Sequence, residues 1–90
     1  MKINTQTKLL DLKGKEIKDQ QEVLTVGIIL SNTLSLSQKN PARCYLLAKK
    51  FATENEVDLK AEDVVFVKEI LEESKMSALI AGQIIEILEK

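Results

Sequence analysis

The chain has 90 residues, of which 44% are hydrophobic and 30% are charged, and its formal net charge is −1. These values are those of an ordinary globular domain, so they exclude a disordered chain and give no general attraction to nucleic acid or to an anionic membrane. Histidine is absent and Cys44 is the single cysteine, which excludes Ser-His-Asp and Cys-His nucleophiles, the usual zinc sites and an intrachain disulfide.

The first expected element is a β-hairpin whose turn is Lys13-Gly14. Apolar residues alternate with polar ones on either side of this turn: Leu10, Leu12 and Ile17. Gly14 can adopt the positive φ that a tight hairpin turn requires. Residues 19–22 are expected to form a polar loop. Because two strands alone are only marginally stable, the hairpin must pack on helices.

The second expected element is a helix over residues 26–36, with Thr25 as its N-cap. One face of this helix carries Val26, Ile29, Leu30, Thr33 and Leu34. Residues 24–36 contain no charged side chain, which is unusual for a surface helix. The uncharged helix is expected to be buried, either centrally or in a subunit interface. These five residues are the candidate interface of a homo-oligomer, most simply a dimer.

A helix over residues 41–54 should follow, because Asn40 can cap it and Pro41 suits its first position. Its apolar stripe comprises Cys44, Leu47, Ala48 and Phe51. At this spacing Cys44 is expected to be a core residue rather than a reactive thiol. The basic residues around this helix form a candidate basic patch: Lys39, Arg43, Lys49 and Lys50.

From residue 57 onward, the sequence predicts a short extended piece at 57–59 and helices over 60–74 and 77–89. The β-branched run at 64–67 could be a strand, but the helical periodicity that continues to Leu71 favours a helix. Ser77 is expected to cap the last helix. Gly82 lies inside that helix and is interpreted as the mark of a close helix crossing.

Charge divides the chain into two halves. Residues 1–45 carry seven basic and four acidic side chains, a net charge of +3, whereas residues 46–90 carry six basic and ten acidic ones, a net charge of −4. We interpret this as weak attraction between the halves of one fold. The alternative interpretation is a basic N-terminal face that meets a partner or nucleic acid.

Together these elements predict one α+β domain over residues 1–90 that is mostly helical. An N-terminal β-hairpin, with or without a third short strand at 57–59, is expected to pack on a four-helix, bundle-like core. Residues 1–7 could be flexible.

Three stretches carry a family resemblance. The first is 12–17 (LKGKEI) with 24–27 (LTVG), the second is 57–63 (VDLKAED), and the third is 81–84 (AGQI) with 87–89 (ILE). In these stretches the chain resembles a group of proteins of roughly this length that bacteriophages and prophages encode. The resemblance covers nearly the whole chain and implies a phage setting, but it implies no activity and no site residues.

The function expected from the sequence is therefore non-enzymatic, with no cofactor and no metal. We expect a small phage or prophage protein in the host cytoplasm that acts through protein–protein contacts, in assembly or in modulating a host protein. Its partner would be a second copy or another phage or host protein, and no membrane is expected, because no apolar run is long enough to span one. The alternative is a small nucleic-acid-associated regulator that uses the basic patch.

Overall fold

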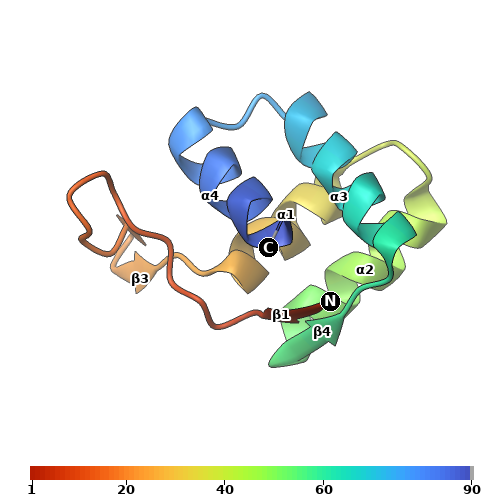
Figure 1. Ribbon diagram of the computed structural model, residues 1–90, viewed down its shortest axis with the longest axis horizontal. Helices are drawn as coiled ribbons and strands as arrows, with labels where there is room; N and C mark the ends of the chain where they lie inside the picture. Colours follow the sequence, from red (N-terminus) through yellow and green to blue (C-terminus); the bar gives the residue numbers. More distant parts are fainter. Residues whose placement is uncertain (90) are drawn as a thin grey trace.

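The computed structural model describes residues 1–89 and places four helices beside two small antiparallel sheets (Figure 1). The helices are α1 (Val26–Leu36), α2 (Pro41–Thr53), α3 (Ala61–Glu73) and α4 (Ala78–Leu88). Each expected helix is present, and its ends lie within one residue of the expected range. The β-branched run at 64–67 is helical, as its periodicity indicates. The predicted class, mostly helical α+β, is confirmed.

The first sheet joins two segments that lie before α1 and after α2 in the sequence. Strand β1 (Lys2–Asn4) pairs with β4 (Glu56–Asp58), so that Ile3 lies opposite Val57, and both of these side chains are buried. Residues 1–7, which could be flexible on the sequence alone, thus include a strand. The third short strand exists, but it pairs with β1 instead of extending the hairpin.

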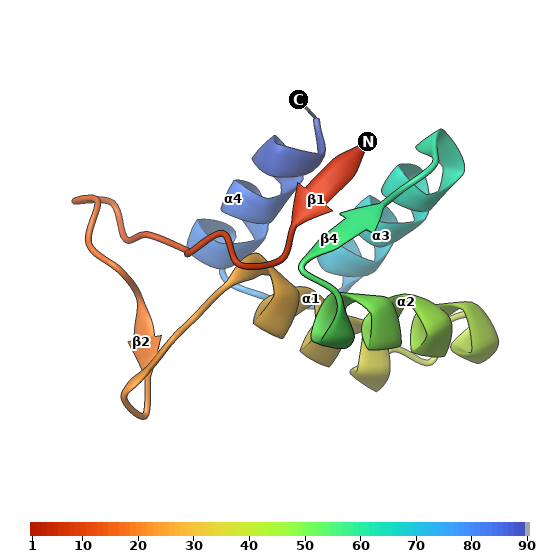
Figure 2. The ribbon, with the colours of Figure 1, turned by 90° about the horizontal axis from the view of Figure 1, so that it is seen from below.

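Residues 10–23 form an arm that projects from the helical body, on the left of Figures 1 and 2. Its hairpin consists of β2 (Lys18–Asp19) and β3 (Glu22–Val23), joined by Gln20 and Gln21 with φ of 51° and 72°. Two successive positive φ values match the right-handed twist of paired strands. The predicted hairpin around Lys13-Gly14 was therefore misplaced: residues 11–15 do form a tight turn, but a single bridge, Leu10 to Glu16, flanks it.

The core lies between the apolar faces of the helices and the β1–β4 sheet. Its most deeply buried side chains include Ile3, Leu30, Leu34, Phe51, Val67 and Ile84. Cys44 is also buried, as expected. A core made almost entirely of aliphatic side chains is stabilised by buried area, at about 25 cal/mol per Å².

Of the two helical glycines, Gly27 lies at a close approach of backbones and Gly82 does not. A Cβ at position 27 would lie 2.8 Å from Thr5 Cβ and 2.9 Å from the carbonyl oxygens of Thr5 and Phe51. A Cβ at position 82 would meet no heavy atom of residues 1–89 within 4 Å. The expectation of a helix crossing at Gly82 is therefore wrong, because this glycine lies on the exposed side of α4.

Three helix starts test the predicted caps. Thr25 Oγ1 accepts a hydrogen bond from Ile28 N, and Ser77 Oγ accepts one from Ile80 N, so both predicted caps are confirmed. Asn40 has a left-handed backbone (φ 45°), and within residues 1–89 its side chain makes no capping hydrogen bond. The left-handed turn at Asn40 leads directly into Pro41, which occupies the first position of α2 as predicted.

Candidate interaction groove

A groove of about 640 Å³ separates the C-terminal half of α1 from the end of α3. Its apolar lining is Ile29, Leu36, Ile70 and Met76. Ile70 is buried and forms the floor, while Leu36 at the end of α1 is 82% exposed. A cleft that is mainly apolar and has a few polar groups at its edge is the usual form of a binding site.

The uncharged character of α1 explains why the groove is apolar. Asn32 and Thr33 are the polar residues that α1 contributes to the lining, and the charged residues there are Lys39 and Glu73. Both of these lie at the rim, where the α1–α2 connection passes α3. The groove therefore combines an apolar interior with a charged edge.

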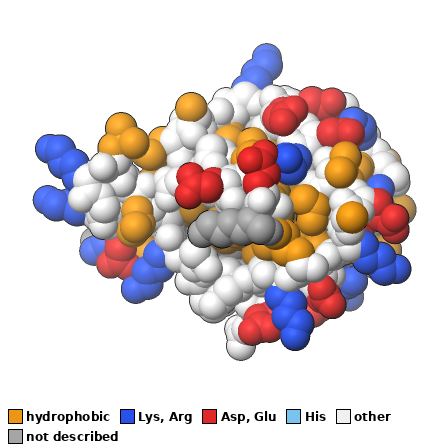
Figure 3. Space-filling view, viewed as in Figure 1, with side chains coloured by type: hydrophobic (Ala, Val, Ile, Leu, Met, Phe, Trp, Pro, Cys, Tyr) orange, Lys and Arg blue, Asp and Glu red, His pale blue; other side chains and the backbone are white. Residues whose placement is uncertain are grey.

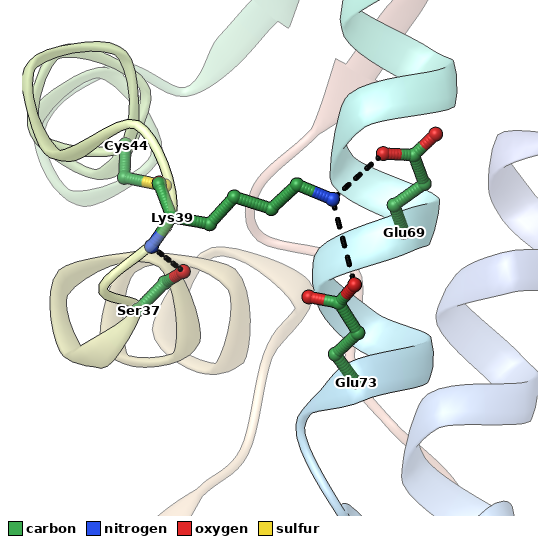
Figure 4. Close-up of polar contacts among 5 residues, drawn as sticks. All are labelled: Ser37, Lys39, Cys44, Glu69 and Glu73. Carbon is green, nitrogen blue, oxygen red and sulfur yellow. Dashed lines mark hydrogen bonds and ion pairs between the residues drawn. The ribbon is translucent and has the colours of Figure 1, made fainter.

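Lys39 lies in the loop between α1 and α2, and its side chain forms ion pairs with α3 across this rim (Figure 4). Its Nζ lies 3.1 Å from Glu69 Oε2 and 3.4 Å from Glu73 Oε1. Its backbone N donates to Ser37 Oγ, and its carbonyl oxygen accepts from Cys44 Sγ. The hydrogen bond to Glu69 is the main cause that raises the pKa of Lys39, so Lys39 keeps its positive charge beside two carboxylates.

The structure separates the five predicted interface residues into two groups. Val26, Leu30 and Leu34 are at most 1% exposed and belong to the core, where no partner can reach them in the folded chain. Ile29 and Thr33 are half-buried and line the groove. The accessible part of the predicted interface is thus the side of α1 that faces the groove.

Sequence reasoning missed Leu36, Ile70 and Met76. Leu36 had a signal, because it is the last residue of the uncharged segment. Ile70 lies inside the helix predicted over 60–74, and Met76 lies between two helices, where periodicity says nothing. Only the packing of α1 against α3 shows that the three residues share one groove.

Two of the four residues of the predicted basic patch, Arg43 and Lys39, pair with carboxylates of α3. Arg43 Nη2 lies 2.9 Å from Asp63 Oδ1, and its guanidinium stacks over the Phe66 ring at 4.3 Å from the centroid. The Arg43 hydrogen bond is the main cause that lowers the pKa of Asp63. Lys39 is paired with Glu69 and Glu73 as described, whereas Lys49 and Lys50 are exposed on α2.

A second hollow of about 560 Å³ lies beside the start of α1 and is lined mainly by polar groups such as Thr25 and Ser31. The first backbone amides of α1 are already used. Val26 N and Gly27 N donate to the carbonyl oxygens of Thr7 and Thr5, and Ile28 N donates to Thr25 Oγ1. This helix start therefore has no free donor to offer an anion.

Within residues 1–89, no three acidic or cysteine side chains gather in a way that could hold a metal ion. In the same part of the chain, no helix has both the length and the apolar run needed to cross a bilayer. Comparison of the chain with protein-family models, curated proteins and solved structures gives no match.

Proposed function

We propose that the protein is a non-enzymatic interaction module and that the groove between α1 and α3 receives apolar side chains of a partner protein. One observation carries this proposal: Leu36, 82% exposed, stands at the edge of an apolar groove that has Ile70 as its floor. Covering this surface would remove apolar area from water on both partners, which favours association.

The proposed setting is the cytoplasm of a host cell that carries a phage or prophage gene for this chain. The resemblance of residues 12–17, 57–63 and 81–84 supports the phage setting. The lone buried thiol of Cys44 suits a reducing compartment. In this setting the module would act in assembly or by modulating a host protein.

A regulator that touches nucleic acid is the second candidate. Lys49 and Lys50 are exposed on α2, and Tyr45 on the same helix is 63% exposed. A gel shift at low salt that Lys49→Ala with Lys50→Ala abolishes would favour it. Because Lys39 and Arg43 face carboxylates, this surface has only a small positive charge, and we place it second.

Photo-crosslinking in cells tests the groove directly. A photoreactive amino acid replaces Leu36 in one variant and, as a matched control, Leu46 in another. Leu46 is 60% exposed on α2 and does not line the groove. We expect a discrete crosslinked product from position 36 and none from position 46. No product from position 36, or equal products from both positions, would contradict the proposed function.

A further inference from the structure

Leu12 is the most exposed large hydrophobic residue in the described part of the chain. Its exposed fraction is 94%, and it lies on the arm rather than on the helical body. Figure 3 shows hydrophobic and basic side chains together at the end of the arm. A single exposed leucine needs no explanation by itself, so the way in which this one is held decides its meaning.

The backbone around Leu12 is fixed by a dense set of hydrogen bonds. Asp11 Oδ1 accepts from Lys13 N at 2.8 Å and from Lys15 N at 3.0 Å. Asp11 N donates to Lys15 O, and Gly14 N donates to Asp11 O. Gly14 has a φ of +83°, which L side chains rarely adopt. The turn therefore holds the backbone of Leu12 in one conformation, so little further ordering of the backbone is needed on binding.

The base of the arm is fixed as well. Gln83 on α4 accepts a hydrogen bond from Leu10 N at 2.9 Å and donates one to Leu10 O at 2.6 Å. Lys8 Nζ lies 2.8 Å from Glu16 Oε2, which links the two sides of the loop. Figures 1 and 2 show that the arm projects away from α2, whereas the groove includes the connection that leads into α2. Leu12 therefore stands outside the groove of its own chain.

We infer that Leu12 docks in the groove of a second copy of this chain, in a reciprocal exchange that forms a twofold dimer. The inference rests on the proposed function of the groove and names its occupant. Charge supports the pairing, because Lys13 and Lys15 follow Leu12 and give the turn over residues 11–15 a net charge of +1, whereas Glu69 and Glu73 stand at the rim of the groove.

The charge of the rim stays negative after its internal pairing. Lys39 offsets one of the two carboxylates that it contacts, so the pair of lysines on an incoming arm would meet a net negative edge. The exchange thus places apolar against apolar and basic against acidic surface.

The dimer is tested by sedimentation velocity on the full chain and on three exposed-leucine variants. Leu12→Asp changes the arm, Leu36→Asp changes the groove, and Leu46→Asp is the matched control on α2. Each side chain is at least 60% exposed, so the fold should persist, which circular dichroism verifies. A twofold dimer contains each contact twice, so we expect the first two variants to raise the dimer Kd by about 100-fold and the control to leave it unchanged.

Mixing the variants tests the reciprocity. A heterodimer of Leu12→Asp with Leu36→Asp keeps one intact contact, because one chain supplies Leu12 and the other supplies an intact groove. The mixture should dimerise about tenfold more tightly than either variant alone. A wild-type chain that is monomeric at high micromolar concentration, or a dimer that Leu12→Asp leaves unchanged, would overturn the inference.

The crosslinking experiment separates failure of this inference from failure of the proposed function. A product from position 36 with twice the mass of the chain supports exchange between copies. A product of any other mass leaves the groove as a binding site but overturns a second copy as its occupant. Absence of a product removes both.

Discussion

Thr5 shows how much of this fold depends on contacts of single residues. Its hydroxyl hydrogen is shared between the carbonyl oxygens of Glu54 and Asn55, just after the end of α2, which lie 2.6 and 3.1 Å from Oγ1. Its own carbonyl oxygen accepts from Gly27 N at the start of α1. One buried threonine thus connects the β1 segment to two helices, and Gly27 is the residue that lets the backbones come close enough.

The two helical glycines should respond to alanine with opposite signs. Gly27→Ala places a Cβ against backbone oxygens that cannot move away, so we expect a loss of about 2–3 kcal/mol in the free energy of unfolding. Gly82→Ala fills open space and removes a helix-weakening glycine, so a gain of about 0.5–1 kcal/mol is expected. Urea unfolding measures both, and equal effects at the two sites would refute this account.

The Arg43–Asp63 pair should make the free energy of unfolding depend on pH in the acid range. Because Arg43 lowers the pKa of Asp63 below its ordinary value of 3.8, the folded state gains stability above that value. This gain is lost as the pH falls through the lower pKa of the folded state. Because the pair is partly exposed, this gain in the free energy of unfolding should be at most about 1 kcal/mol.

Asp63→Asn tests this linkage. The free energy of unfolding, measured by urea at a series of pH values, should differ from wild type near neutral pH, and the difference should shrink in acid. Glu72→Gln, an exposed carboxylate on the same helix, is the control and should have little effect. A difference for Asp63→Asn that stays constant with pH would contradict the assignment.

At the scale of elements, Gln83 joins α4 to a segment that is distant in the sequence. It lies 73 positions from Leu10 and holds both backbone groups of that residue. It forms the link between α4 and the base of the arm, and the arm positions Leu12. A side chain on the last helix thus fixes a loop near the start of the chain.

Gln83→Ala should loosen the arm more than the core. We expect faster amide hydrogen exchange over residues 10–23 and a loss of about 1 kcal/mol in global stability. Glu86→Ala, at an exposed position on the same helix, is the control. The role of Gln83 would be refuted if exchange in the arm stayed unchanged.

The helices could be predicted because their signal is local: an apolar residue every three or four positions marks each one. The pairing of β1 with β4 could not, because it joins Lys2 to Asp58 and no nearby residue specifies it. The hairpin was misplaced because glycine at position 14 is the expected turn residue, whereas the paired strands turn at Gln20-Gln21. For the groove, the helical periodicity of α1 could predict Ile29 and Thr33. It could not predict Met76, because only tertiary packing brings this residue to the groove.

For the whole molecule, the distribution of charge predicts how the proposed dimer would respond to salt. The lysines of the arm and the glutamates of the rim are exposed, so their attraction is screened at high ionic strength. We expect the dimer Kd to rise several-fold between about 0.05 M and about 0.5 M NaCl, while the apolar contact of Leu12 keeps part of the affinity. Sedimentation equilibrium measures this, and a dimer that tightens with salt would argue against the charge pairing.

The buried thiol of Cys44 gives the molecule an internal reporter of its own opening. Its Sγ donates to Lys39 O at 3.0 Å, and the side chain is 1% exposed, so a thiol reagent can reach it only when α2 separates from the core. With a single cysteine in the chain, every labelling event reports the same site. The rate of thiol modification should therefore follow the opening of α2. Because Lys39 belongs to the rim of the groove, a partner that occupies the groove should slow this chemistry without touching the sulfur.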